Sequence, residues 1–474
     1  MASDSEIEAT LLSLLGQEGV SRTEASLRRY ASDALRPTRS FPGAREIVAK
    51  PQWVVWPGSV AHVQELARLA NQYRVPLIPY GGGSGLMGGA LSSNGGIVVD
   101  MQRLNRIRRI NNDDRAVEAE AGAVLQSVDD ALAEHRMMLG HDPWTVPVAT
   151  VGGTISTNGL GYRGAQYGSM GEQVLGLEVV LPDGTLLTTK PLQKTSVGPQ
   201  LDHLFIGGEG CFGLITAATL KAFPIPEARR LFAIRFPSFE AGYRSVLAMF
   251  ATGIVPSCID YGEQFGVMNA WSDDDELPEP GAEMFLVFEG LREVVDALSN
   301  RALALCREQG GTQEDESEAQ DFWDTRHDSA VRFKQQRDST GTAPYLQPRQ
   351  TGPLVDYIHV ALPASRVLEY RSRCMELAEQ QGVLIREFGL WNRPELFSVV
   401  LADPSGDAER LGNAVDAFLR ACQDMGGSME YVHGVGLRLA HLMAREHGVG
   451  LDVLRSIKRT LDPNGIMNPG KLGL

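Results

Sequence analysis

A glycine-rich stretch, Pro79-Tyr80-Gly81-Gly82-Gly83-Ser84-Gly85-Leu86, limits what this chain can fold into. Glycine reaches positive φ at little steric cost and lets a ligand approach the main chain closely. Successive N–H groups in such a turn form a concave anion site that suits a pyrophosphate. A short apolar strand over 75–79 precedes the stretch, and a second strand over 97–101 follows it. This context disfavours a Rossmann loop, which needs a helix directly after the glycines, and a Walker loop, which needs Gly-Lys-Ser/Thr.

Two later glycine clusters weigh against the simpler interpretation of the first as a surface turn. The second is Ala149-Thr150-Val151-Gly152-Gly153-Thr154-Ile155-Ser156-Thr157-Asn158, whose hydroxyl groups can donate to phosphate or ring oxygens. The third is Glu209-Gly210-Cys211-Phe212-Gly213-Leu214-Ile215. Close to the C-terminus the chain reads Asp462-Pro463-Asn464-Gly465-Ile466-Met467-Asn468-Pro469-Gly470-Lys471. Three such loops together favour a site for a large phosphate-bearing cofactor.

Bulk properties narrow the class of protein. A chain of 474 residues exceeds one ordinary core, so we expect two or more domains. A net charge of −15 argues against sequence-independent nucleic-acid binding. The five cysteines are widely spaced, which favours a reducing compartment over a disulfide framework. We therefore expect a cytoplasmic protein with no integral membrane segment and a small-molecule substrate, and a homodimer is the assembly we consider.

Hydrophobic patterns predict an α+β chain. The N-terminal half reads as a helical segment within 4–34, a strand at 53–57, a helix from its N-cap at Ser59 to about Tyr73, a strand at 116–121 and a helix at 124–135. Strands at 174–181 and 186–189 are joined by a tight turn. Later strands are expected at 230–236, 284–290, 355–361, 383–389 and 396–401, and later helices at 239–252, 291–309, 313–334, 364–381, 407–425 and 437–461. The alternation of strands and helices resembles two ferredoxin-like halves.

The three clusters and the C-terminal ending resemble the FAD-linked oxidase superfamily of the vanillyl-alcohol-oxidase type. That resemblance implies an α+β fold: a two-subdomain PCMH-type FAD-binding domain and a ferredoxin-like α+β substrate, or cap, domain. We expect an N-terminal helical segment over 1–45, the FAD-binding domain over 46–226, the cap domain over 227–430 and a C-terminal segment over 431–474 that returns to the FAD-binding domain.

Within the superfamily, the sequence most resembles the branch of D-2-hydroxy-acid dehydrogenases, which includes D-lactate and D-2-hydroxyglutarate dehydrogenases and the D subunit of glycolate oxidase. Alkyl-dihydroxyacetone-phosphate synthase is a close relative. The residues behind this resemblance are Trp323-Asp324-Thr325-Arg326, Val360-Ala361-Leu362-Pro363-Ala364-Ser365-Arg366 and His433-Gly434-Val435-Gly436. The resemblance implies noncovalent FAD, because Tyr80 and Ser84 stand in the first loop where some relatives have a histidine bonded to the flavin.

This sequence departs from the branch at its metal ligands. Members often carry His-x-Gly-Asp-Gly-Asn-x-His and a Glu-His pair that hold a divalent metal. Here the corresponding residues are Glu387-Phe388-Gly389-Leu390-Trp391-Asn392-Arg393-Pro394, and Val432 precedes His433. We therefore expect no metal and a more apolar pocket around Phe388, Trp391 and Phe397.

The resemblance assigns roles to single residues. His433 is the expected base for the substrate hydroxyl, because a neutral imidazole is available near pH 7. Tyr431 is the alternative base if the substrate is a phenol, and Arg326, Arg332 and Arg349 are candidate clamps for a carboxylate or phosphate. Lys471 is expected to place positive charge near the flavin. The predicted cofactor-binding residues are Pro79, Tyr80, Gly81, Gly82, Gly83, Ser84, Gly85, Leu86, Pro143, Ala149, Thr150, Gly152, Gly153, Thr154, Ser156, Thr157, Asn158, Glu209, Gly213, Ile215, Asn468 and Lys471.

The predicted activity is therefore an FAD-dependent oxidation in which a hydride leaves an alcohol carbon, most simply that of a D-2-hydroxy acid, for flavin N5 without a metal. Two alternatives stay open. A phenol oxidase of the vanillyl-alcohol type is favoured by the missing metal ligands and the aromatic pocket. A transferase like the ether-lipid synthase is weakened by the single histidine, His433, before Gly-Val-Gly.

Overall fold

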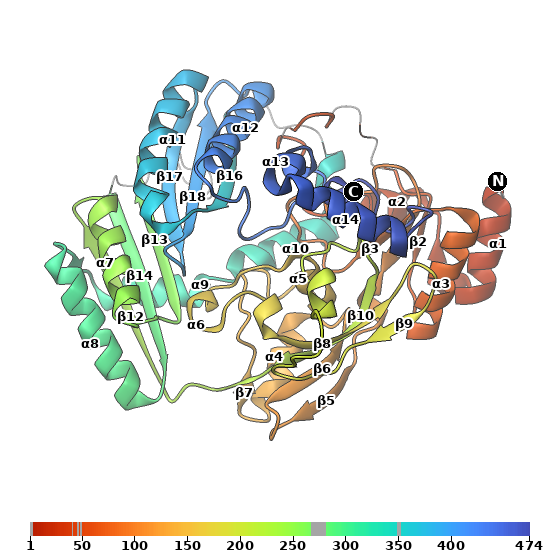
Figure 1. The fold of residues 1–474 in the computed structure, drawn as a ribbon, viewed down its shortest axis with the longest axis horizontal. Helices are drawn as coiled ribbons and strands as arrows, with labels where there is room; N and C mark the ends of the chain where they lie inside the picture. Colours follow the sequence, from red (N-terminus) through yellow and green to blue (C-terminus); the bar gives the residue numbers. More distant parts are fainter. Residues whose placement is uncertain (1–2, 40, 45–46, 48–49, 267–280, 348–351) are drawn as a thin grey trace.

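A computed structural model describes residues 3–39, 41–44, 47, 50–266, 281–347 and 352–474. The chain folds into two sheets that carry the glycine loops and a seven-stranded sheet, the cap sheet, which stands to one side of them (Figure 1). The helices at 239–251, 292–308, 367–381 and 408–424 cover the face of the cap sheet that is turned away from the glycine loops (Figure 1). This mixture of sheets and helices confirms the predicted α+β class.

The first sheet carries the first glycine loop. Its order is β1-β2-β4-β3, with β3 and β2 both parallel to β4. The Ser59 hydroxyl accepts the N–H of His62 and starts α3, as the sequence predicts. The N-terminal helical prediction is wrong in part, because α1 ends at Gly16, where φ is +72°, and a short strand pairs with β2. The elements are α1 (Asp4–Leu15), β1 (Val20–Ser21), α2 (Glu24–Arg29), β2 (Trp53–Val55), α3 (Val60–Tyr73), β3 (Leu77–Tyr80) and β4 (Ile97–Asp100).

The second sheet supports the other two glycine clusters. Its order is β5-β6-β10-β8-β9, and every pair in it is antiparallel. The second cluster forms a helix, α5, that the sequence pattern did not predict, and β5 was also missed. The elements are β5 (Ile107–Asn111), β6 (Ala116–Glu120), α4 (Leu125–Ala133), β7 (Met137–Met138), α5 (Val151–Thr157), α6 (Gly164–Tyr167), β8 (Val174–Val180), β9 (Leu186–Thr188), β10 (Leu214–Lys221) and β11 (Phe223–Pro224).

The cap sheet has the order β15-β12-β14-β13-β17-β18-β16. The first four strands have the ferredoxin-like order, and the last three repeat it without the fourth strand. The two halves join where β13 pairs antiparallel with β17. The elements are β12 (Ala228–Phe236), α7 (Phe239–Ala251), β13 (Cys258–Gln264), β14 (Gly281–Gly290), α8 (Arg292–Glu308), β15 (Thr312–Gln313), β16 (Leu354–Ala361), α11 (Val367–Gln381), β17 (Leu384–Trp391), β18 (Leu396–Asp403) and α12 (Ala408–Asp424).

The two faces of the cap sheet differ in character. Because side chains alternate along a strand, Tyr261 and Phe397 lie on the face that α7 covers, where both pack against Phe239. Tyr357 and His359 lie on the opposite face, which is turned toward the glycine loops and which we call the open face. Function is therefore to be sought on this second face.

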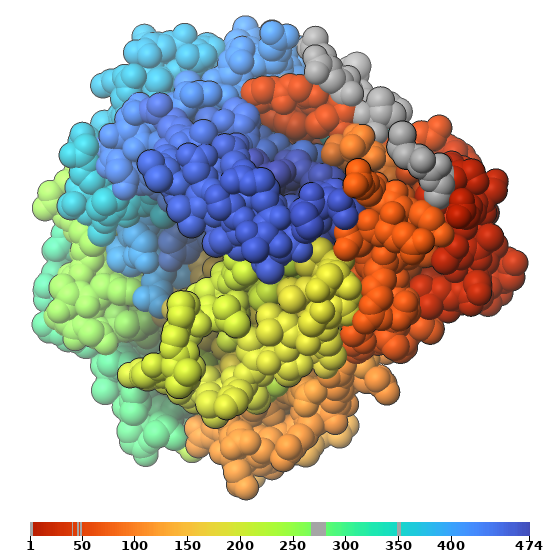
Figure 2. Space-filling model, turned by 45° about the vertical axis from the view of Figure 1, so that its right-hand side comes forward, coloured from red at the N-terminus to blue at the C-terminus, as the bar shows by residue number. Residues whose placement is uncertain are grey.

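Two segments connect the cap sheet to the glycine loops. The predicted helix over 313–334 is two helices, α9 (Glu316–Thr325) and α10 (Asp328–Thr340), and α10 runs between the two parts of the chain (Figure 1). Arg337 of α10 donates to the carbonyl oxygen of Gly82. The tail forms α13 (Met443–His447) and α14 (Val449–Leu461) and lies against the segments that carry the glycine loops (Figure 2). Across the described residues, no helix has the length and apolar character needed to span a membrane.

Candidate active site

The first glycine loop presents unused backbone donors. Among the described residues, no hydrogen bond involves the N–H groups of Gly82, Gly83, Ser84 or Gly85. A Cβ atom on Gly82 would lie 2.2 Å from the carbonyl oxygen of Val148, so only glycine fits there. Because buried N–H groups need a partner, this loop is suited to an anionic ligand.

The second cluster begins a helix at the same place. The Thr150 hydroxyl accepts the N–H of Gly153 at the N-cap of α5, and it lies 2.4 Å from where a Cβ of Gly81 would be. A helix N-terminus favours negative charge. The hydroxyl groups of Ser156 and Thr157 donate to carbonyl oxygens of their own helix, rather than standing free for a ligand.

The third cluster holds the returning tail. Glu209 is buried, and its carboxylate accepts the N–H of Val435 at 2.6 Å and that of Gly436 at 2.8 Å. Burial raises the pKa of Glu209 to about 7, and the two N–H donors oppose that shift. A Cβ on Gly434 would lie 2.5 Å from this carboxylate. Glu209 therefore fixes the segment that follows His433 against the glycine loops.

Asn468 and Lys471 of the tail lie inside the same region. The Asn468 amide donates to the carbonyl oxygens of Gly89 and Glu209, and its own Oδ1 is buried with no partner among the described residues. The Lys471 ammonium donates to the carbonyl oxygen of Leu91 at 2.6 Å, and burial lowers its pKa to about 8. Lys471 thus lies buried beside the first loop and not in solvent.

The other predicted cofactor residues surround these three clusters. Leu86 contributes a carbonyl oxygen that accepts Arg39, and Asn158 adopts a left-handed φ of +52° at the end of α5. Gly213 has no room for a side chain, because Val179 and the Val180 carbonyl lie against it. The remainder are Pro79 and Tyr80 at the end of β3, Pro143 and Ala149 in the loop before α5, Gly152 and Thr154 within α5, and Ile215 within β10.

His433 lies on the open face of the cap sheet. Its side chain is 15% exposed, and its Nδ1 lies 3.7 Å from a carboxylate oxygen of Glu430. Burial, together with the positive charges of Arg39 and Arg438, lowers the pKa of His433 to about 3. Burial raises the pKa of Glu430 to about 7. His433 is therefore neutral near pH 7 and able to accept a proton.

Two aromatic rings contact His433, and a third packs behind one of them. The ring of His359 lies 4.8 Å from that of His433, and Tyr357 lies 5.8 Å from it. His359 also packs on Trp391 at 4.4 Å. Burial and the neighbouring His433 lower the pKa of His359, so it too is neutral.

Sequence reasoning missed two buried arginines beside this cluster. Arg39 donates to Asp356 at 2.9 Å, and Arg438 donates to the other oxygen of Asp356 at 2.5 Å. Arg39 also bonds the carbonyl oxygens of Leu86 and Tyr357, which links the first glycine loop to the cap sheet. Two cations share one carboxylate here, so the region favours an anionic ligand. No local motif marks Arg39 or Arg438, because the contacts form between distant segments.

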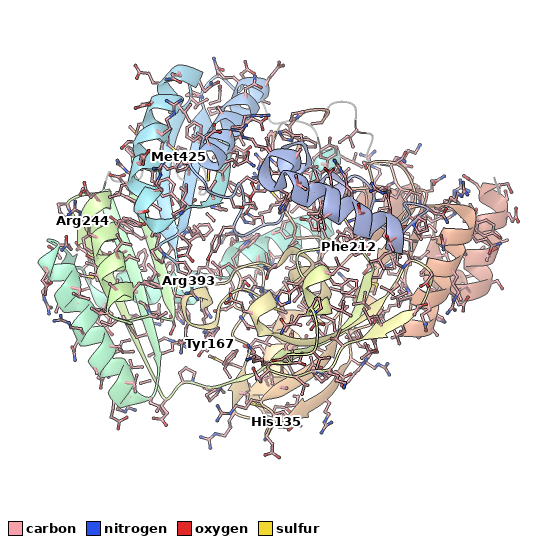
Figure 3. The ribbon with its side chains drawn as sticks, viewed as in Figure 1. His135, Tyr167, Phe212, Arg244, Arg393 and Met425 are labelled. Carbon is pink, nitrogen blue, oxygen red and sulfur yellow. The ribbon has the colours of Figure 1, made fainter. Side chains whose placement is uncertain are left out.

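The other predicted catalytic residues lie elsewhere. The Tyr431 hydroxyl donates to Glu395, and burial raises its pKa. Arg326 stacks on Trp323 at 4.0 Å and donates to Asp142, so its guanidinium is already engaged. Arg349 lies outside the described residues. Arg393, two residues before Glu395 in the sequence, lies in the region between the cap sheet and the glycine loops (Figure 3).

Glu387 and Val432 stand at positions where members of the branch that the sequence resembles carry metal ligands, and the structure describes both residues. Glu387 accepts the amide of Gln264 at 2.5 Å, and Val432 has no ligating side chain. In the part of the chain that the structure describes, no group of three or more His, Cys, Asp or Glu side chains is arranged to hold a metal ion.

The assembled residues fit FAD. Unbonded N–H groups, a helix N-terminus and a buried, unpartnered Asn468 oxygen meet where the three clusters converge. The neutral His433 lies on the same tail, two residues before Val435 and three before Gly436, whose N–H groups the Glu209 carboxylate accepts. A dinucleotide pyrophosphate would satisfy the donors, and a redox group would then be held near the open face of the cap sheet.

Comparison with protein families gives two matches. Residues 51–190 match the model of an FAD binding domain, and residues 225–472 match that of the C-terminal domain of FAD linked oxidases.

Curated relatives match along nearly the whole chain. The chain is 28% identical to a probable mitochondrial D-lactate dehydrogenase of Danio rerio, over 98% of this chain and 91% of the relative. It is 25% identical to glycolate oxidase subunit GlcD of Bacillus subtilis, over 98% and 96%. A D-2-hydroxyglutarate dehydrogenase of Xanthomonas citri is 27% identical over 90% of each chain.

Solved structures share the fold. An alkyldihydroxyacetonephosphate synthase superimposes with a TM-score of 0.76 and 20% identity, over 99% of this chain and 85% of that one. A p-cresol methylhydroxylase with substrate bound gives a TM-score of 0.77 and 18% identity, over 99% and 96%. These likenesses confirm the predicted fold.

Proposed function

Because the chain belongs to the family of FAD linked oxidases, we propose that it oxidises the hydroxyl-bearing carbon of a D-2-hydroxy acid. FAD supplies the hydride acceptor when bound. The relatives named as D-lactate and D-2-hydroxyglutarate dehydrogenases support this substrate class. The observation that carries the proposal is a neutral, buried His433 next to two arginines that share a single Asp356.

Each residue has a defined task in this proposal. His433 takes the proton of the substrate hydroxyl at one of its ring nitrogens. The charges of Arg39 and Arg438 attract the substrate carboxylate, and that negative charge in turn makes protonation of His433 easier. Tyr357 and His359 surround the reacting end and exclude water. Glu209 holds the His433 segment in place through the backbone of Val435 and Gly436.

The proposal is tested by anaerobic bleaching of the flavin across a panel of D-2-hydroxy acids, their L-enantiomers and 4-alkylphenols. We expect D-2-hydroxy acids to bleach the flavin within seconds and the other compounds to leave it oxidised. Bleaching by phenols alone would contradict the proposal.

A phenol oxidase is the second candidate. The rings of Tyr357, His359 and Trp391 around His433 favour it, because an aromatic substrate could pack among them. Against it, the Tyr431 hydroxyl is bonded to Glu395, and the two buried arginines have no task with an uncharged phenol.

We expect the flavin to be bound noncovalently. The first loop offers Tyr80, which is buried, and Ser84, and neither is a histidine. Acid precipitation of the purified protein should therefore release the yellow colour into the supernatant. Colour that stays with the pellet would show a covalent bond.

We also expect activity without a protein-bound metal. Glu387 is bonded to Gln264, and Val432 stands before His433. Dialysis against EDTA should leave the rate of flavin reduction unchanged. The idea fails if EDTA abolishes the rate and zinc or manganese restores it.

A further inference from the structure

A row of small residues crosses the open face of the cap sheet. His359 pairs with Ser398, Ser398 with Gly389, and Gly389 with Gly262, so these residues lie side by side on one face. We call Ser398, Gly389 and Gly262 the small-residue strip. It spans two strand spacings, or about 10 Å. Glycine within a strand often marks the close approach of a ligand.

Polar groups line the strip. Glu387 and Gln264 lie on one side, and Trp391 and Asp260 lie on the other. The Oε1 atom of Glu387 lies 3.4 Å from where a Cβ would stand on Gly262 and equally far from where one would stand on Gly389. This oxygen therefore lies above the strip. Gln264 bonds only the other oxygen, Oε2, and Oε1 takes part in no hydrogen bond among the described residues. An acceptor is therefore presented to whatever lies on the strip.

The end of the strip at Ser398 lies next to His359 and His433. His359 and Trp391 belong to strands that flank β18, yet their ring centroids are 4.4 Å apart, so both rings lean over β18. His359 is 3% exposed, and its Nδ1 is buried with no partner among the described residues. His433 lies directly beyond His359. This unpartnered nitrogen is independent evidence that a polar ligand belongs here.

The far end of the strip is acidic. Burial raises the pKa of Asp260 to about 7 and raises that of Glu387, and Trp391 hydrogen-bonds the Asp260 carboxylate. The next residue along the row, opposite Gly262, is Glu283, whose carboxylate lies 3.7 Å from the Arg235 guanidinium, so the carboxyl groups at this end that form no ion pair among the described residues are those of Asp260 and Glu387. A second carboxylate on the substrate would meet these oxygens unfavourably. A hydroxyl or ammonium group would instead donate to them.

We propose that the small-residue strip binds the tail of the substrate, and that this tail carries a hydrogen-bond donor, a hydroxyl or an ammonium group, in place of a second carboxylate. The inference rests on the proposed function, in which the reacting carboxylate end lies near His433. It makes Glu387 a specificity-determining residue that touches the substrate tail.

Binding is measured separately from oxidation. The holoenzyme is titrated by calorimetry with four acids that lack a 2-hydroxyl group: hexanoate, 6-hydroxyhexanoate, 6-aminohexanoate and hexanedioate. We expect 6-hydroxyhexanoate or 6-aminohexanoate to bind roughly tenfold or more tightly than hexanedioate, as one hydrogen bond to a charged group implies. Whichever of 6-hydroxyhexanoate and 6-aminohexanoate binds more tightly shows whether the site prefers a hydroxyl or an ammonium group on the tail. Tightest binding of hexanedioate, or binding of none of the four, would overturn the inference.

Variants assign the effect to Glu387. E387Q should remove most of the preference for the donor tail, and E387R should reverse it in favour of hexanedioate. E263Q is the matched control, because Glu263 lies on the neighbouring strand β13 but on the opposite face of the sheet, paired with Arg371. Equal preferences in wild type and E387R would show that the tail does not reach Glu387.

Flavin reduction by the corresponding 2-hydroxy acids is recorded in parallel. If none of them reduces the flavin while the donor-tailed acids still bind best, the proposed function fails and the tail preference stands. If 2-hydroxyhexanedioate is the fastest reductant, the proposed function stands and the tail preference fails.

Discussion

His433→Ala should keep its FAD and reduce it about 10²- to 10⁴-fold more slowly than the wild type, which is the usual loss when a general base is removed. The expectation follows from a buried, neutral imidazole on the open face of the cap sheet. The measurement is anaerobic stopped-flow reduction of the flavin by a D-2-hydroxy acid, with the flavin content of each protein determined beforehand.

Flavin retention separates a chemical role from a structural one. The His433 segment is held by backbone bonds to Glu209 and Glu430 that alanine at position 433 preserves. A matched control is His441→Ala, because His441 bonds Asp416 away from this cluster and should leave the rate unchanged. A wild-type rate in His433→Ala would exclude His433 as the base.

The pH dependence follows from the same surroundings. A free histidine would give a loss of rate below its ordinary pKa near 6.5. Burial, Arg39 and Arg438 lower the pKa of His433 to about 3, so the protonated, inactive form should appear only far below neutrality in the free enzyme. Glu430, which lies 3.7 Å from His433 and whose pKa is raised to about 7, is the neighbour of His433 expected to titrate near neutral pH. A limb due to Glu430 should persist in His433→Ala, whereas the acid limb due to His433 should vanish.

Local signals predicted most of the regular elements, and long-range contacts decided the rest. The helix after Ser59 was predicted because residues close together in the sequence form both its N-terminal cap and its apolar face. Strand β13 was missed because Asp260 and Gly262 interrupt its apolar pattern. Those residues lie on the open face of the cap sheet, and the core side chains of the strand lie on the other face. Helix α5 was missed because Gly152 and Gly153 read as loop, although Thr150 caps it.

The candidate site was predicted in the same uneven way. The glycine loops and His433 carry short patterns that can be read along the chain. Arg39 and Asp356 are 317 residues apart in sequence, and their contact forms only when the N-terminal segment packs on the cap sheet. Arg326 was assigned to a substrate, but the structure shows it engaged with Asp142 and Trp323. Short motifs therefore point to the glycine loops and to His433, whereas a contact such as that between Arg39 and Asp356 carries no local signal.

The largest expected effect on the cofactor comes from Gly82→Leu, which should yield folded protein with little or no FAD. A Cβ at position 82 would lie 2.2 Å from the carbonyl oxygen of Val148 and 2.9 Å from its carbonyl carbon. Both are main-chain atoms of the loop before α5, so they cannot turn aside as a flexible side chain can. The first and second glycine clusters must then separate, and the unbonded N–H groups of Gly83 and Gly85 lose their position.

Overpacking of this kind costs about 1–3 kcal/mol where the surroundings relax, which corresponds to a loss of about 5- to 150-fold in affinity. Contact with rigid backbone places Gly82→Leu at or beyond the upper end. The matched control is Gly58→Leu, because a Cβ at Gly58 meets no atom within 4 Å and its φ is not in the left-handed region. The ratio of flavin to protein absorbance is measured for both variants, with circular dichroism to verify folding. Full flavin occupancy in folded Gly82→Leu would show that this loop does not hold the cofactor, since the two clusters cannot keep their present contact once a side chain stands between them.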